Sequence, residues 1–282
     1  MRKTHSKRVG VRNQRRNIMD MGLKGKTAVI TASSLGLGKA MAQGLAQEGA
    51  NVTICARRNN PLETAKNEIE KVGGQVLSIK ADMNSKDDIE KVISETVSRF
   101  GKLDILINNA GDAEVGRKIE DEDDVWQATY NINVWSCVRA IRAAVPHMRK
   151  NGGGNIINVA SVSGHSGLAG MADYNSAKAA MLSLTKTFAA DLAPDNIRVN
   201  AVNPALIHTP LWERLAKENF VGSVGDSVDE VFENLSKQML LIPRYGKPEE
   251  VANVTTFLAS ERASFVTGAC WNVDGGFTKF II

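Results

Sequence analysis

Three residues in the middle of the chain have the types and the spacing that acid–base chemistry requires. Tyr174 follows Ser161 by thirteen residues, and Lys178 follows Tyr174 by four. In a helix over residues 173–193, Tyr174 and Lys178 would lie on one face, a few ångströms apart. A fixed ammonium stabilises a phenolate and lowers the pKa of the phenol, which is ordinarily about 10. Such a tyrosine can exchange a proton with an oxygen that Ser161 also hydrogen-bonds, which suits reversible carbonyl reduction.

The Tyr-x-x-x-Lys pair is weak evidence by itself, because it also occurs by chance in many helices. The plain alternative is a surface tyrosine whose ring packs on the stem of the lysine. The elements that surround the pair must decide between these two interpretations.

From Lys26 onward, short β-branched runs alternate with longer helical patterns. The predicted strands are 27–31, 51–55, 76–80, 104–108, 155–159, 197–202 and 269–273. The predicted helices are 36–48, 61–72, 85–100 with Ser85 as N-cap, 124–150, 173–193 and 248–259, and a mixed helical insertion spans 210–241. Strands this apolar that alternate with helices indicate an α/β fold in three layers, with a doubly wound parallel sheet covered on both faces. No stretch resembles a linker, so we expect one domain over 22–282, with a lid insertion at about 206–241.

Composition and charge narrow the classes of function. The net charge of +4 is misleading, because residues 1–20 hold seven Lys and Arg against Asp20 and leave −2 for the rest. The body therefore offers no charge-based case for nucleic acid, and no apolar stretch is long enough to span a membrane. Three separated cysteines and four scattered histidines form no metal-binding pattern. Residues 1–21 read as a basic, disordered leader without a secretory signal, and we expect a cytoplasmic protein.

A small-residue turn follows the first predicted strand and could approach a pyrophosphate closely, at the start of a helix. Its spacing is not G-x-G-x-x-G, so a turn that only packs the helix on the sheet remains an alternative. The residues that we assign to cofactor binding here are Thr31, Ser33, Ser34, Leu35, Gly36 and Gly38.

Two arginines stand where an NAD site usually carries an acidic residue. Arg57 and Arg58 follow the second predicted strand, about twenty residues after the glycines. A guanidinium there can pair with a 2′-phosphate, which favours NADP, with NAD possible. The alternative is two solvated surface arginines.

With these features together, the chain resembles the short-chain dehydrogenase/reductase family of single-domain, Rossmann-like enzymes, over about residues 22–277. The motifs stand in the family's order and spacing, and each is weak while the ordered set is specific. They are the turn 31–38; Asp82 after the third strand; Asn108-Asn-Ala-Gly111 after the fourth; Trp126 seven residues before Asn133; Ser161; Tyr174 with Lys178; and the segments 203–209 and 267–276.

The resemblance implies four catalytic residues. Asn133 would hold a water that links Lys178 to solvent, and Ser161 would orient the substrate oxygen. Tyr174 would be the general acid in reduction and the general base in oxidation. Lys178 would bond the nicotinamide ribose and lower the pKa of Tyr174, so both residues also belong to the cofactor site.

The resemblance also implies further cofactor contacts and reveals two departures. Asp82 and Met83 would bind the adenine, and Asn109, Ala110 and Gly111 would line the adenosine side. The nicotinamide side would use Pro204, Ala205, Ile207 and Thr209. The family's usual glycines are replaced by Ala32 in the first turn and by Ala205 after the sixth strand, and alanine tolerates neither a positive φ nor as close an approach.

The resulting prediction is an NADP-dependent oxidoreductase that interconverts a small-molecule carbonyl and a secondary alcohol by hydride transfer. Alternatives are an NAD-dependent sugar or polyol reductase, a 3-oxoacyl-thioester reductase of the same family, and a non-catalytic dinucleotide sensor. The sensor is disfavoured because all four chemical positions are present. Apolar lid residues would either bind a lipophilic substrate or pack the lid on the core, and they are Trp212, Phe220, Phe232, Met239 and Leu240.

The ends of the chain suggest an assembly. The predicted helix 124–150 carries several large apolar residues, and four of the last six residues, 277–282, are apolar. An exposed patch of that kind usually marks an interface. We therefore expect a homo-tetramer with the C-terminal residues buried between subunits, against the alternative of a tail that folds back on its own sheet.

Overall fold

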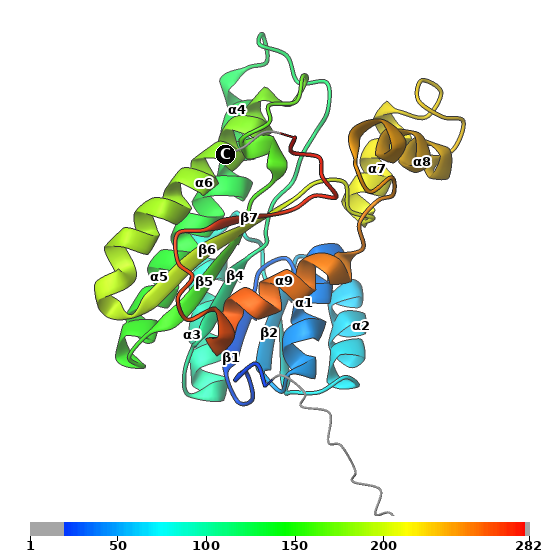
Figure 1. Cartoon of the computed structure of the whole chain (residues 1–282). Coiled ribbons are helices and arrows are strands. Elements are labelled where there is room, and N and C mark those ends of the chain that lie inside the picture. The colour runs from blue at the N-terminus through cyan, green and yellow to red at the C-terminus, as the bar shows by residue number, and fades with distance from the viewer. Residues whose placement is uncertain (1–19, 280–282) are drawn as a thin grey trace, which may run out of the picture.

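A seven-stranded parallel sheet organises the computed structural model, which describes residues 20–279 (Figure 1). The predictions for residues 1–19 and 280–282 lie outside the described residues. The strand order is β3-β2-β1-β4-β5-β6-β7. The strands are β1 (Thr27–Ile30), β2 (Asn51–Ala56), β3 (Val76–Lys80), β4 (Ile105–Asn108), β5 (Gly154–Val159), β6 (Ile197–Pro204) and β7 (Cys270–Val273). The predicted doubly wound α/β fold is confirmed.

Helices cover both faces of the sheet, as the apolar strands require. Ala28 and Ile30 pack under α1 (Gly36–Gln47), α2 (Asn59–Glu70) and α9 (Pro248–Ala259). Val29, between them, points to the opposite face, under α3 (Lys86–Phe100), α5 (Ser136–Lys150) and α6 (Ala172–Leu192). The strand order reverses between β1 and β4, and at such a point the loops after neighbouring strands leave in opposite directions and open a crevice.

Helix boundaries follow local capping chemistry. Ser85 accepts a hydrogen bond from the Asp88 N–H at 3.2 Å and so caps α3, as predicted. Gly101, with φ of +79°, ends the same helix in the left-handed conformation. Helix α2 begins at Asn59, two residues before the predicted start, because Pro61 occupies an early position where it needs no N–H donor.

The predicted helix 124–150 is present, but it contains a π-helical turn. It consists of α4 (Asp123–Tyr130), a π-helical turn η1 (Asn131–Trp135) and α5. A regular α-helix would pair the Thr129 carbonyl with the backbone N–H of Asn133, and a π-turn shifts that pairing by one residue. The Asn133 side chain donates to the Thr129 carbonyl instead, at 3.0 Å. One asparagine therefore stabilises the interruption that redirects it inward.

The predicted lid is a pair of helices that stands apart from the sheet layers (Figure 1). These are α7 (Pro210–Asn219) and α8 (Val228–Met239). They enclose a small core of their own, in which Phe232 stacks on Tyr245 with ring centroids 4.2 Å apart. Phe220, Met239 and Leu240 join that core, so most of the apolar lid residues hold the lid together.

Asp20 and Met21, which the sequence analysis assigned to the leader, contact the folded body. The Arg262 side chain donates to the Asp20 carbonyl at 2.7 Å, and the Glu261 N–H donates to the Met21 carbonyl at 3.2 Å. Met21 also packs against the core under α1 and α9. Of the helices within residues 20–279, none combines the length and the apolar character needed to cross a membrane.

Candidate active site

Residues that follow three neighbouring strands line one cavity at the carboxyl edge of the sheet. The cavity has a volume of about 250 Å³. Ser161 lies just beyond β5, Asn109 and Gly111 just beyond β4, and Ala205 just beyond β6. Tyr174 and Lys178, from the first turns of α6, complete this wall. The structure thus brings together three of the four predicted catalytic residues on one surface.

Lys178 is held from beneath by the sheet. Its side chain is 3% exposed, and Nζ donates to the Val159 carbonyl at 2.9 Å. Nζ also lies 5.5 Å from the centroid of the Tyr174 ring. The helical spacing therefore places the ammonium beside the tyrosine, as predicted.

The pKa values of this pair are set mainly by burial. Enclosure raises the pKa of Tyr174 to about 12, against a smaller opposing effect of its hydrogen bond with Ser161. The pKa of Tyr174 therefore lies above its ordinary value and not below it as predicted, because the cost of burying a phenolate prevails. The same burial lowers the pKa of Lys178 to about 8.

Asn133 lies directly behind this wall. It is fully buried, and its Nδ2 donates to the Asp112 carbonyl at 2.9 Å. Its Oδ1 has no hydrogen-bond partner. A Cβ atom added to Gly111 would lie 2.7 Å from this oxygen and 3.3 Å from Lys178 Nζ, so glycine is needed between them. A buried acceptor without a partner can hold a water, which the predicted relay requires.

The burial of Lys178 leads to a stability prediction. We expect Lys178→Met to stabilise the protein at neutral pH by up to about 3 kcal/mol, because the folded wild type must keep a charge in a dry site. The unfolded lysine stays protonated up to a pKa of 10.5, whereas the folded one loses its proton near 8. The wild type therefore gains stability between these values, and the advantage of the variant should shrink there.

Urea unfolding of both proteins at several pH values measures this change. Lys186→Met, on the exposed side of the same helix, is the matched control and should show no such trend. An advantage of Lys178→Met that stays constant from neutral to alkaline pH would contradict the assigned pKa.

A second cavity, of about 540 Å³, adjoins the first across the turn after β1. Ala32 and Leu35 line both cavities. Leu35 is the N-cap of α1 and makes no side-chain capping bond, and the first turn of α1 has no acidic residue. The free N–H groups at this helix start therefore suit a phosphate group, as the sequence predicted.

Not every predicted residue of this turn reaches a cavity. The Thr31 hydroxyl accepts from the N–H groups of Asn109 and Ala110, both at 2.9 Å. The Ser33 hydroxyl is buried and donates to the Ile30 carbonyl at 2.6 Å. A Cβ at Gly38 would lie 2.6 Å from the Ala32 carbonyl. These three residues shape the turn, whereas Ser34, Leu35 and Gly36 line the cavities.

The two alanines that replace the family's glycines behave differently. Ala32 adopts a φ of +51°, in the left-handed region that glycine occupies without strain. Asn109 Nδ2 donates hydrogen bonds of 3.0 Å to the carbonyls of Thr31 and Ala32, and these bonds hold Ala32 in that conformation. Ala205 is not among the residues with positive φ in the described range, so the alanine there is unstrained.

The predicted adenosine residues line the second cavity. Arg57 and Arg58 line it, and neither forms an ion pair within residues 20–279. Asp82, Met83, Ala110 and Gly111 line the same cavity, with Asp82 Oδ1 accepting from the Asn84 N–H at 3.0 Å. Asn109 faces the first cavity instead of the adenosine side. Pro204, Ala205, Ile207 and Thr209 line the first cavity, on the predicted nicotinamide side.

Several residues around the two cavities escaped the sequence analysis. Arg214 of α7 joins the lid to the loop after β4, through Asp112 at 2.8 Å and Glu114 at 2.7 Å. Asp112 lies on the wall of both cavities, and its charge also raises the pKa of Tyr174. No local pattern reveals a pair separated by about a hundred residues. Within residues 20–279, no cluster of His, Cys, Asp or Glu could hold a metal ion.

Known proteins are similar to this chain along nearly its whole length. The model of a family described as enoyl-(acyl carrier protein) reductase matches residues 31–278. Dehydrogenase/reductase SDR family member 4 of Mus musculus is 37% identical over 259 residues, which are 90% of this chain and 88% of that protein. The 3-oxoacyl-(acyl-carrier-protein) reductase FabG of Thermotoga maritima is 36% identical over 256 residues, which are 91% of this chain and 99% of that protein.

A solved structure gives the same result in three dimensions. L-sorbose reductase from Gluconobacter frateurii, complexed with NADPH and L-sorbose, superposes with a TM-score of 0.89. It is 40% identical, and the match covers 93% of this chain and 100% of that one. Together with the parallel sheet and the gathered Ser161, Tyr174 and Lys178, these likenesses show that the chain is an enzyme of the short-chain dehydrogenase/reductase family.

Proposed function

We propose that this enzyme is an NADP-dependent oxidoreductase that interconverts a carbonyl compound and a secondary alcohol. The main support is that Ser161, Tyr174 and Lys178 line one cavity, which also reaches the uncapped start of α1. The likeness to a reductase that binds NADPH supports the choice of cofactor. Arg57 and Arg58, both free of acidic partners within the described residues, suit the additional 2′-phosphate.

The protein's own groups would handle the proton. In reduction, the Tyr174 hydroxyl gives its proton to the carbonyl oxygen, while the Ser161 hydroxyl donates a hydrogen bond to the same oxygen. Lys178 is still positively charged at neutral pH, since its pKa is about 8, and it stabilises the phenolate that remains. A water that donates a hydrogen bond to Asn133 Oδ1 would return a proton to Tyr174 through Lys178. The bound dinucleotide would supply the hydride.

The cofactor would lie across both cavities. Arg57, Arg58, Asp82 and Met83 would hold its adenosine end, and the N–H groups at the start of α1 its pyrophosphate. The nicotinamide end would lie near Ile207 and Thr209. Thr209 is also the N-cap of α7, so the same residue would couple the cofactor to the lid.

Two alternatives of the same chemistry have specific support. The likeness to L-sorbose reductase favours a sugar or polyol pair, and the likeness to FabG favours a 3-oxoacyl thioester.

An NAD-dependent enzyme would not need Arg57 and Arg58, because NAD has no 2′-phosphate for them to bind. A non-catalytic sensor is disfavoured, because Asn133, Ser161 and Tyr174 all hold positions consistent with their catalytic roles.

A turnover assay tests the proposal. The purified protein is mixed with NADPH or NADH and a panel of ketones, ketoses and oxoacyl thioesters, and cofactor oxidation is followed by absorbance. We expect NADPH-dependent reduction of at least one class. NADPH binding without turnover of any carbonyl or alcohol in the panel would instead support the sensor.

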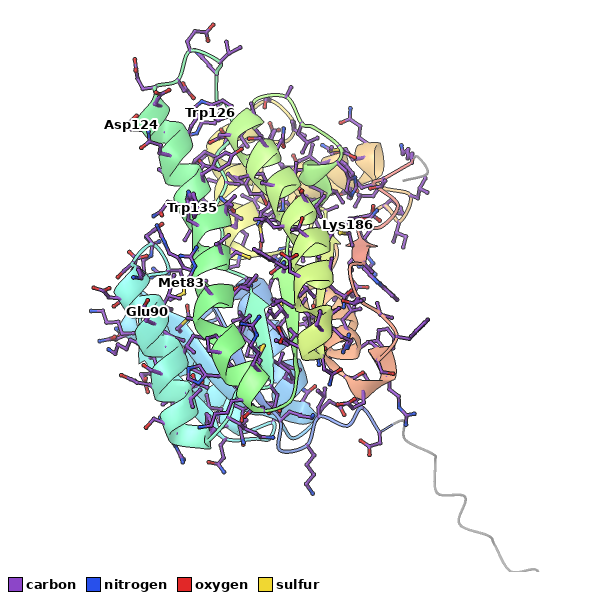
Figure 2. All side chains as sticks on the ribbon, turned by 90° about the vertical axis from the view of Figure 1, so that its left-hand side faces the viewer. Met83, Glu90, Asp124, Trp126, Trp135 and Lys186 are labelled. Carbon is purple, nitrogen blue, oxygen red and sulfur yellow. The ribbon has the colours of Figure 1, made fainter. Side chains whose placement is uncertain are left out.

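We further propose that the enzyme is a homo-tetramer. Figure 2 shows Trp126 and Trp135 on one face of the molecule, along α4, η1 and α5. Trp135 is 49% exposed, and both tryptophans line a shallow hollow together with Tyr130. Light scattering at micromolar concentration should give the mass of a tetramer, and Trp135→Asp should lower it. A wild-type monomer at this concentration would contradict the proposal.

A further inference from the structure

The part of the first cavity beyond the reacting groups is built from apolar side chains. Tyr174 packs into one continuous cluster with residues from the loop after β4, the loop before α6 and the lid helix α7. A molecule whose carbonyl meets the Tyr174 hydroxyl would therefore lay its substituents against this cluster. The members of this cluster that line the cavity are Ala113, Leu168, Met171, Leu211, Trp212 and Leu215. Phe277, from the C-terminal segment, also lines the cavity.

Several polar side chains around the same cavity already bond to protein groups. Asn109 Nδ2 is bonded to two carbonyls of the first turn, and the Thr209 hydroxyl accepts from the Trp212 N–H at 3.4 Å. Asp112 Oδ1 is bonded to Arg214 at 2.8 Å. A polyol needs a partner for each hydroxyl that it buries, and each missing partner is costly. The hydroxyls of Ser161 and Tyr174 are placed to serve one oxygen, the reacting one.

The lid residue Arg214 offers little to a large anionic carrier. Arg214 already has three acidic neighbours, Asp112, Glu114 and Glu218, at 2.8, 2.7 and 3.4 Å. Burial lowers the pKa of Arg214, but its three acidic partners together raise that pKa by more. The acidic surface of an acyl carrier or the phosphates of a coenzyme thioester would meet acids that outnumber the base, which disfavours binding.

From these three observations we infer that the substrate is a neutral, largely apolar ketone or its secondary alcohol, with the reacting oxygen as its one strongly polar group. The inference rests on the proposed function, whose cavity it uses. It separates this enzyme from the sugar and thioester alternatives, because the apolar wall favours contact with hydrocarbon and offers few hydrogen-bond partners to additional hydroxyls.

Competition between three substrates tests the inference. Acetophenone, L-sorbose and acetoacetyl-coenzyme A are compared with NADPH, and NADPH binding is measured separately by fluorescence. We expect kcat/KM for acetophenone to exceed the other two by about a hundredfold or more. Preference for L-sorbose or for the thioester would overturn the inference and leave the proposed oxidoreductase intact. Binding of NADPH without reduction of any of the three would count against both.

Variants of the wall supply the second arm. Leu168→Asn and Leu211→Asn should each lower kcat/KM for acetophenone by about tenfold, because they replace apolar contact with an amide. NADPH affinity should stay unchanged. Leu241→Asn is the matched control, since Leu241 is 71% exposed and does not line the cavity. Wall variants that reduce acetophenone as well as the control does would also overturn the inference.

Discussion

Replacing Tyr174 with phenylalanine is expected to lower turnover roughly a thousandfold while NADPH still binds. The ring keeps its place in the apolar cluster with Met171 and Leu215, so the fold and the cavity should persist. Only the transferable proton is lost. The measurement is the rate of NADPH oxidation with saturating ketone, beside NADPH affinity from fluorescence.

Tyr130→Phe is the matched control for this substitution. Tyr130 lies at the end of α4, faces a different hollow, and lines neither cavity of the candidate site. Its loss should leave turnover unchanged. If Tyr174→Phe kept activity within about tenfold of wild type, a loss of only ~1.4 kcal/mol, Tyr174 would not be the general acid.

Arg57→Asp, alone and combined with Arg58→Ser, should reverse the preference between cofactors. The guanidinium that would pair with a 2′-phosphate is replaced by a carboxylate, which repels phosphate and accepts from a ribose hydroxyl. Charge-assisted hydrogen bonds contribute about 1.5–3 kcal/mol, so the ratio of kcat/KM for NADPH over NADH should fall by roughly ten- to a hundredfold.

The control for the charge change is Arg142→Asp, on the exposed side of α5. It alters the net charge equally but lies outside the second cavity, so the cofactor ratio should not change. A ratio that also stays constant in Arg57→Asp and in the double variant would show that the two arginines are only surface charges.

The order of the motifs along the sequence was enough to predict the fold of this enzyme and the grouping of its site residues. The carboxyl ends of parallel strands lie at one edge of the sheet, so the residues that follow these strands lie there too. The connectivity alone therefore places Asn109 after β4, Ser161 after β5 and Ala205 after β6 close together. The helical spacing of Tyr174 and Lys178 is equally local. Such features follow from periodicity and connectivity, which a sequence displays directly.

Other features depended on the tertiary structure. The π-helical turn within the predicted helix 124–150 contains Asn133, whose side chain donates to two carbonyls, one of them in the distant loop at Asp112. The ion pairs of Arg214 cross about a hundred residues of sequence. The apolar lid residues divide between the lid's own core around Phe232 and the cavity wall at Trp212. Hydrophobicity marks residues as buried but does not say against what.

The pKa of Tyr174 is the clearest example of what only the fold decides. The sequence shows that an ammonium lies nearby, and this predicted a lowered pKa. Burial acts in the opposite direction and prevails, raising the pKa to about 12. Desolvation is set by all the atoms that surround a group, whereas a motif names only one of its neighbours. The sequence thus identified the residues that can exchange a proton, and the packing around them set how readily the ligand-free protein gives it up.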